Sequence, residues 1–432
     1  MQSFFSIWVA VFLTVQFCAG HLITAQTCLA EGIHLASQLE IDEFANKYPG
    51  CNTVLGTILI QESQPGTIFD LRGLAQLSVI QGSLQISNNR VLKTLSGLDN
   101  LLQTGNLSIS SNSTLQNIQN LSSLIRINQS LRIDNNLSLT SISGLHNIRA
   151  IPGDVSISDN DLLPNLKGLD QLNSIGEHLI ITSNAGLQNL IGLENLERIG
   201  QETFIKDNLS LKSLEALSQL KVIGKDLMLD NNPQLSDLQG LNQVASVGGN
   251  LLVVNNQSML DLRGLESLAA IEGILQIFNN ANLRSLAGID QIDHTSITDL
   301  ALLSSPMLSH CSVKSICAYL AAGQGTVSIM MNEEGCQTAD EILDACPGSG
   351  PSTNPLATGT NIFFPNPTSG PLFIRGTLIK DGTYEIIDAA GKLVQQGSVV
   401  QNMMDLGLLA AGMYMVELQV NDNIIREAII KM

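Results

Sequence analysis

Apolar positions recur along most of this chain with a period of 23 or 24 residues. Within one repeat they fall three residues apart, at Leu187, Leu190, Leu193, Leu196 and Ile199. A single Asn recurs in the same register, at Asn89, Asn112, Asn136, Asn160, Asn184, Asn208, Asn232, Asn256 and Asn280. A fixed period in this range predicts a solenoid in which each repeat forms one coil.

Each coil combines a short strand with a series of tight turns. The segment before each Asn, such as LRIDN or LQIFN, alternates apolar and other residues, as a strand with one buried face does. After the Asn, the spacing of three around a Gly-Leu pair favours 3₁₀-like or extended turns over a long α-helix. The glycine supplies a corner where a Cβ would crowd the chain. Stacked coils of this kind predict an all-β dominated fold with a parallel sheet along one side.

The recurring Asn has a structural interpretation. The backbone turns inward at the end of each strand and leaves N–H and C=O groups that its own coil cannot pair. An Asn amide both donates and accepts, so stacked amides can bond their own turn and the neighbouring coil. We interpret the nine residues as a structural ladder, with a ligand-binding row of amides as the alternative.

The strands also predict an outward row of side chains. The residue between the two buried strand positions is, coil by coil, Gln85, Ser108, Arg132, Ser156, Ile180, Phe204, Met228, Leu252 and Gln276. Four adjacent coils carry large apolar residues there, and exposed apolar stripes mark interaction sites. We predict a recognition or self-association surface that consists of Ile180, Phe204, Met228, Leu252, Val254 and Phe278. The alternative is that the chain itself covers the stripe, for instance with residues 296–346.

The start of the chain predicts export. MQSFFSIWVAVFLTVQFCAG is an apolar run followed by small residues, although no Lys or Arg precedes it. It is short for a membrane span, so we interpret residues 1–25 as a cleaved signal peptide, with a membrane anchor as the alternative. The net charge of −18 without a basic run argues against nucleic acid and anionic membrane surfaces as partners.

The cysteines fit an exported chain. Six remain after the signal segment, namely Cys28, Cys51, Cys311, Cys317, Cys336 and Cys346. Two precede the repeats and four follow them, where a solenoid must cover its apolar ends. An even number in an exported protein predicts disulfides, with Cys28 and Cys51 as one pair and the pairing of the other four open. Zinc is the weaker alternative because no CxxC pair occurs.

The sequence shows little catalytic chemistry. The six His residues are scattered, and no GxSxG, HExxH or P-loop motif is present. Several carboxylates lie near strand ends, at Asp134, Asp159, Asp161, Asp207 and Asp230. We interpret them as solvated turn residues, with calcium binding as a minor alternative. We expect no enzyme, no cofactor and no metal, and keep a polysaccharide-degrading β-helix enzyme as the alternative.

Two family resemblances add to this account. The stretch from YPGCNTVLGTILIQ to LAGIDQI, with its repeated phrase GL..L..I.G.L.I..N, looks like the receptor L-domain, a leucine-rich right-handed β-helix. It differs from the common leucine-rich repeat because Leu follows the Asn by three residues, as in Asn136 and Leu139. The resemblance implies the fold but names no ligand.

After a Pro-, Gly- and Ser-rich linker, short alternating strands predict a small Ig-like β-sandwich. This tail resembles the C-terminal sorting domain of type IX secretion cargo. The matching residues are Pro365, Asn366, Pro367, Gly391 in the DAAGK turn, Gly412 and Tyr414. The resemblance implies passage through the periplasm, export by the type IX machinery and removal of the domain, often with attachment to surface lipopolysaccharide.

Together these patterns divide the 432 residues into six parts. They are a signal peptide (1–25), an N-terminal cap (26–57), the solenoid (58–300), a Cys-containing cap (301–346), a linker (347–360) and the sorting domain (361–432). We predict a secreted or surface-displayed binding or adhesion protein that is not integral to a membrane. A protein ligand, a glycan ligand and self-association stay open, and a structural surface component is a further alternative.

Overall fold

The computed structural model describes residues 26–347 in full. In the tail it describes residues 363–364, 366, 368, 370–374, 382–388, 392–399, 402–420 and 423–431. The predicted signal peptide and residues 348–360 of the predicted linker lie outside the described residues. None of the helices in the described part has the length and hydropathy needed to span a bilayer.

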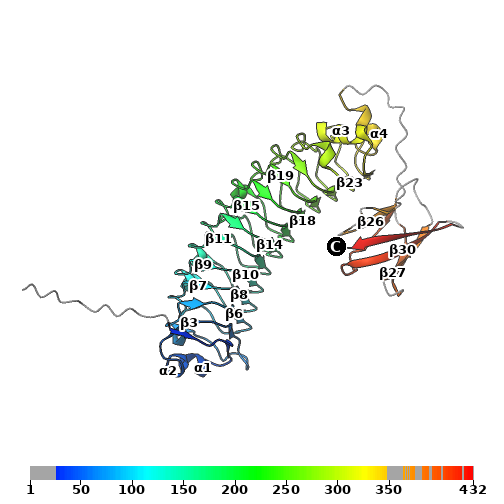
Figure 1. Cartoon of the computed structure of the whole chain (residues 1–432). Helices are drawn as coiled ribbons and strands as arrows, with labels where there is room; N and C mark the ends of the chain where they lie inside the picture. The colour runs from blue at the N-terminus through cyan, green and yellow to red at the C-terminus, as the bar shows by residue number, and fades with distance from the viewer. Residues whose placement is uncertain are drawn as a thin grey trace, which may run out of the picture.

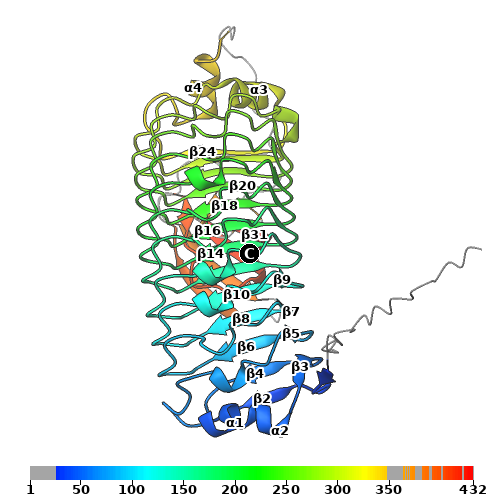
Figure 2. The ribbon, with the colours of Figure 1, turned by 90° about the vertical axis from the view of Figure 1, so that its left-hand side faces the viewer.

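Stacked coils form a curved rod with a long parallel sheet on its inner side (Figure 1). Strands of successive coils follow one another up this sheet (Figure 2). In order, the strands are β2 (Ile33–Leu35), β4 (Ile58–Ile60), β6 (Leu84–Ser87), β8 (Leu107–Ser110), β10 (Leu131–Asp134), β12 (Val155–Ser158), β14 (Leu179–Thr182), β16 (Thr203–Lys206), β18 (Leu227–Asp230), β20 (Leu251–Val254), β22 (Leu275–Phe278), β23 (Asp299–Leu303) and β24 (Thr326–Met330). The sheet therefore extends from the N-terminal cap into the Cys-containing cap.

Shorter strands form two further parallel sheets on the outer side of the curve. The first contains β1 (Gln26–Cys28), β3 (Cys51–Val54), β5 (Val79–Ile80), β7 (Gln103–Thr104) and β9 (Arg126–Ile127). The second contains β11 (Ala150–Ile151), β13 (Ser174–Ile175), β15 (Arg198–Ile199), β17 (Val222–Ile223), β19 (Ser246–Val247) and β21 (Ala270–Ile271). The described part of the chain is thus mostly β, as the repeat pattern predicted.

Helices are few and short. In the described part of the chain, five 3₁₀ turns occur, at Arg72–Leu74, Gln119–Leu121, Ser143–Leu145, Glu215–Leu217 and His294–Ser296. Four α-helices lie in the two caps, namely α1 (Gln38–Asp42), α2 (Phe44–Lys47), α3 (Lys314–Ala322) and α4 (Ala339–Asp344). The 3₁₀ turns between strands agree with the apolar spacing of three, which suits turns of three residues.

The core of the rod is a continuous column of Leu, Ile and Val side chains. The five apolar positions of the Asn184 coil are all fully buried, namely Leu187, Leu190, Leu193, Leu196 and Ile199. Burying one such side chain contributes roughly 1.5–3 kcal/mol. Because each coil contacts only its neighbours, this stabilisation depends on the stack as a whole.

Glycines occur in the coils at positions where neighbouring coils approach closely. Gly192 has φ 114°, and a Cβ there would overlap the carbonyl oxygen of Leu166 in the preceding coil. A Cβ at Gly144 would meet the carbonyl oxygen of Ile118 in the same way, although Gly144 lies in a 3₁₀ turn. As these two turns are built, neither has room for a side chain at this position.

Three disulfides staple the two ends of the rod. Cys28 pairs with Cys51 in the N-terminal cap. The other four, whose pairing the sequence left open, form Cys311–Cys336 and Cys317–Cys346 in the C-terminal cap. Each disulfide therefore cross-links two segments within one cap.

The tail folds into two antiparallel sheets. One contains β25 (Phe363–Phe364), β26 (Leu372–Ile374) and β29 (Met403–Met404). The other contains β28 (Leu393–Ser398), β27 (Gly382–Asp388), β30 (Gly412–Val420) and β31 (Asn423–Lys431), paired in that order. The tail lies beside the inner face of the rod, near its C-terminal end (Figure 1).

Candidate functional site

The outward face of the long sheet is the candidate site, and strand register aligns its side chains. Phe204 on β16 pairs with Met228 on β18, and Met228 pairs with Leu252 on β20. One row further out, Val254 pairs with Phe278 on β22. The six predicted stripe residues therefore stand in two adjacent rows, and we call them the outward stripe.

The outward stripe is buried at one end and partly open at the other. Leu252, Val254 and Phe278 are only 2%, 8% and 8% exposed. Ile180, Phe204 and Met228 are half-buried. The difference points to a covering group near the C-terminal end of the rod.

That covering group is the tail domain. Phe373 of β26 packs in one cluster with Leu252, Val254 and Phe278, and Met403 of β29 packs against it. The rings of Phe373 and Phe278 lie 5.8 Å apart at 66°, an edge-to-face arrangement that aromatic pairs favour.

Residues 296–346, the cover suggested by the sequence, do not lie across the stripe. Instead β23 and β24 continue the sheet and lengthen the apolar surface with Ala301 and Leu303, both buried. The sequence could not indicate the tail as cover because the partners are about 100 residues apart in the chain.

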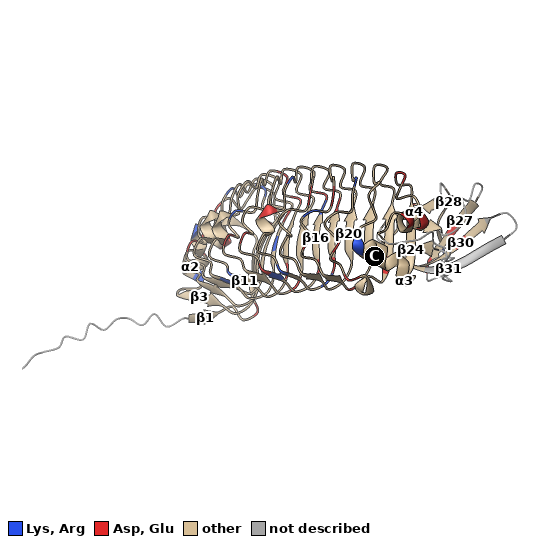
Figure 3. Cartoon of the chain, turned by 90° about the horizontal axis from the view of Figure 1, so that it is seen from above, with Lys and Arg blue, Asp and Glu red and all other residues tan. Residues whose placement is uncertain are grey.

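The N-terminal half of the same face is mostly polar, with half-buried Leu59 of β4 as an apolar exception. Its outward positions include exposed Gln85 and Arg132 and half-buried Ser108 and Ser156. Arg132 forms an ion pair with Asp134, with Nε and Oδ1 2.7 Å apart. Charged residues of both signs are spread along the rod in the view of Figure 3, without a continuous basic face.

The Asn ladder lies inside the rod behind this face. The backbone N–H of Asn136 donates to Oδ1 of Asn160 at 3.1 Å, and its Nδ2 donates to the carbonyl oxygens of Ile109 and Asp134. All nine ladder residues are fully buried. The contacts join neighbouring coils, which leaves these amides engaged inside the protein.

Three residues outside the predicted ladder complete it. Glu62 donates its backbone N–H to Oδ1 of Asn89 at one end. At the other end, Asn280 donates its backbone N–H to Ser305 Oγ, and Ser305 donates its own to Oδ1 of Asn332. These positions depart from the repeat, because Glu62 and Ser305 are not Asn and because Asn332 follows Ser305 by 27 residues.

The strand-end carboxylates take up several structural roles. Asp159 and Asp207 adopt left-handed φ values of 54° and 57° just before the ladder Asn, a conformation that Asp tolerates better than most residues. Asp134 pairs with Arg132, and Asp230 pairs with Lys206 at 3.1 Å. Asp161 accepts the backbone N–H of Ala185 in the next coil at 3.3 Å, and Asp207 accepts from Asn231 in the next coil.

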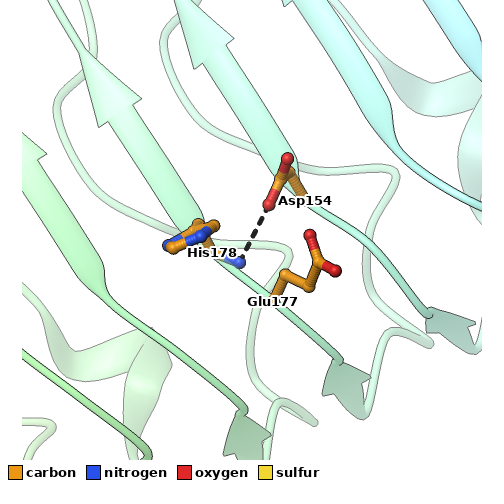
Figure 4. Close-up of side chains that lie close together, drawn as sticks. All are labelled: Asp154, Glu177 and His178. Atoms are coloured by element: carbon orange, nitrogen blue, oxygen red, sulfur yellow. Dashed lines mark hydrogen bonds between the residues drawn. The ribbon is translucent and has the colours of Figure 1, made fainter.

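One cluster that the sequence did not suggest lies at the turns before β12 and β14. Asp154, Glu177 and His178 have ligand atoms within 4.8 Å of one another, a spacing that could hold a metal ion (Figure 4). Asp154 Oδ1 accepts the backbone N–H of His178 at 3.1 Å, and His178 Nδ1 lies 2.6 Å from Glu202 Oε2. The 24-residue period could have revealed it, since Asp154 and His178 occupy equivalent positions in adjacent coils.

The residues of the predicted sorting motif are described only in part. Tyr414 is buried, and its hydroxyl donates to the carbonyl oxygen of Ala410 at 2.9 Å. Gly412 is exposed and begins β30, and Asn366 is half-buried. Pro365, Pro367 and Gly391 lie outside the described residues.

Comparison with known proteins identifies the tail. Residues 362–432 match the model of the secretion system C-terminal sorting domain. No curated protein and no solved structure matches the chain. The tail is therefore a type IX sorting domain. The protein is a partner of the type IX machinery and is exported to the cell surface or outside the cell.

Proposed function

We propose that this protein is a non-enzymatic binding or adhesion protein, and that the outward face of the long sheet is its recognition surface. The observation that carries the proposal is the register of that face. Thirteen parallel strands line the concave side of the curved rod. Their side chains that point away from the solenoid core stand in register from strand to strand. A rigid, extended concave surface of this kind is what solenoid proteins use to bind partners.

Side-chain chemistry supports a recognition surface within this face. Half-buried Phe204 and Met228 lie between the polar N-terminal half and the covered C-terminal half. Aromatic and Met side chains are enriched in protein interfaces, and polar rims surround them. We propose a protein or glycan ligand that spans this boundary.

Several contacts favour binding over catalysis. Polysaccharide-cleaving sites need two carboxyl groups poised on one substrate bond. Here Asp134 and Asp230 are each paired with a cation, and Asp207 accepts a hydrogen bond from Asn231. These carboxylates have partners suited to stabilising the turns.

We further propose that the solenoid is a right-handed receptor L-domain-like β-helix and that the two tail sheets form an Ig-like sandwich. The repeated GL..L..I.G.L.I..N phrase and the ladder support the first assignment. The pairing of a three-stranded and a four-stranded antiparallel sheet supports the second.

A binding screen tests the proposed function. The exported protein is presented to an array of glycans and extracellular proteins, beside a variant with Phe204→Asp and Met228→Asp. We expect one class of ligand to bind the native protein with an affinity that the variant loses by at least about tenfold. Retention of all binding by the variant would place recognition on another face.

A matched control makes this comparison specific. Leu137 and Leu209 are about half exposed, at 50% and 49%, and follow ladder Asn residues outside the long sheet. A variant with Leu137→Asp and Leu209→Asp introduces the same charges elsewhere. It should bind like the native protein.

A further inference from the structure

The apolar end of the outward face is covered by another domain of the same chain. Leu303 is fully buried and Phe278 is only 8% exposed, although both point away from the solenoid core. Their packing partners are Phe373 and Met403 of the tail. This surface would be a contiguous apolar patch without the tail, and such patches on secreted proteins mark contact sites.

The tail presents a side chain suited to this contact. On β26, Leu372 and Ile374 belong to the tail's own core, whereas Phe373 between them belongs to the cluster on the solenoid. Alternation along a strand sends neighbouring residues to opposite faces. β26 therefore serves two apolar cores, one within the tail and one between the domains, and Phe373 is fully buried by the second.

The tail also brings a cation close to the rod. Lys431, at the end of β31, is buried in the assembled chain. Burial lowers the pKa of its ammonium group and the charge of Lys206 on β16 lowers it further, while Asp405 acts in the opposite direction.

We propose that the sorting domain is an intramolecular cover that closes the C-terminal half of the outward face for as long as it stays attached. Removing the tail exposes Leu252, Phe278 and Leu303 together. This inference rests on the proposed function for its consequence, because the cover would keep the recognition surface from partners until export is complete.

Thiol labelling in the full-length chain tests the cover. The six cysteines after the signal segment are paired in disulfides, so a thiol introduced by Leu252→Cys can be followed with a maleimide. Gln85→Cys at the equivalent outward position of β6 is the reference, because Gln85 is exposed. We expect the thiol at position 252 to react at least about tenfold more slowly than the thiol at position 85.

Opening the cover should abolish this difference. Adding Phe373→Asp to Leu252→Cys places a charge in the interface, and labelling should then accelerate by about tenfold. Leu408→Asp is the matched control, since Leu408 is 98% exposed on the same tail, and it should leave the rate unchanged. Far-ultraviolet circular dichroism establishes that each variant remains folded.

Removal of the tail gives a second readout. A protease site placed within residues 348–361 allows the tail to be cut off the folded chain, and size-exclusion chromatography follows its departure. The rate at position 252 should rise to that at position 85. Equal labelling rates at positions 252 and 85 in the uncut chain would contradict the proposed cover. Slow labelling of position 252 after the tail has left would contradict it as well. Neither outcome depends on a ligand, so a failure of the cover can be distinguished from a failure of the proposed binding function.

Discussion

At the residue scale, the ladder Asn couples neighbouring coils through groups that have no access to water. Asn184 donates its backbone N–H to Asn208 Oδ1 and its Nδ2 to the carbonyl oxygens of Ile157 and Thr182. Its own Oδ1 accepts the backbone N–H of Asn160. One side chain thus satisfies buried backbone groups of its own coil and of the preceding coil, which accounts for its recurrence along the rod.

Replacing one ladder residue should weaken the rod. Asn184→Ala leaves several buried backbone groups unpaired, at about 1–3 kcal/mol each. We expect the free energy of unfolding, measured in guanidinium chloride, to fall by about 3 kcal/mol. Asn195→Ala is the control, because exposed Asn195 makes a similar bond to the carbonyl oxygen of Asp170, and it should cost less than about 0.5 kcal/mol. Equal losses would refute a special role for the ladder.

Glu62 gives the N-terminal end of the ladder a dependence on pH. Its carboxylate accepts backbone N–H groups from Gly66, Thr67, Ile68 and Arg90. Burial raises the pKa of Glu62, but these four hydrogen bonds outweigh burial and hold the pKa below its ordinary value. A lowered folded pKa stabilises the fold above the unfolded pKa, and this stabilisation is lost as pH falls through the folded pKa.

The pH profile of unfolding should therefore differ between the native protein and Glu62→Gln. Between pH 6 and pH 3, roughly spanning the titration of an ordinary Glu, the native protein should lose more stability than the variant. Denaturation midpoints across this range provide the measurement. Parallel profiles would mean that Glu62 has the same pKa in the folded and unfolded chains.

At the element scale, the close approach of turns in adjacent coils limits which residues fit at this turn. Where Gly192 stands in one coil, Ala216 stands in the next, within the 3₁₀ turn Glu215–Leu217. The two turns have different backbone conformations at this position. Gly192 uses a φ of 114° that an L side chain rarely adopts, whereas the 3₁₀ turn accepts a methyl group.

This contrast yields a paired prediction. Gly192→Ala should destabilise the rod by about 2 kcal/mol or more, since the new Cβ overlaps the Leu166 carbonyl oxygen. The reverse change, Ala216→Gly, should cost only about 0.5–1 kcal/mol. Thermal or chemical denaturation of both variants measures the difference. A mild effect of Gly192→Ala would show that neighbouring coils can separate without loss of stability.

Much of the coil could be predicted from sequence because its causes repeat. The 24-residue register, the Asn positions and the apolar spacing each appear many times, so chance agreement is excluded. A contact that does not recur from coil to coil cannot be predicted in this way. The period aligns His178 with Glu202, but an ion pair between the two side chain types occurs at this place alone among the described residues, and Ser305 takes an Asn position with a different side chain.

At the scale of the whole molecule, the two domains meet on a surface that neither domain's pattern reveals alone. The sequence identified the apolar residues at 252, 254 and 278 but could not indicate what covers them. Phe373 lies in a strand whose alternation suits a small sandwich, and its role follows only from the contact with Phe278. Contacts between distant segments depend on three-dimensional docking, which local patterns do not encode.

The most direct test of this account compares the same protein with and without its tail, using a ligand found in the binding screen. The tail-free form should bind at least about tenfold more tightly than the full-length chain, as expected when an attached group competes for the site. Phe373→Asp in the full-length chain should recover most of that difference. Equal affinity of the full-length and tail-free forms would contradict the claim that the outward face both binds the ligand and is covered by the sorting domain.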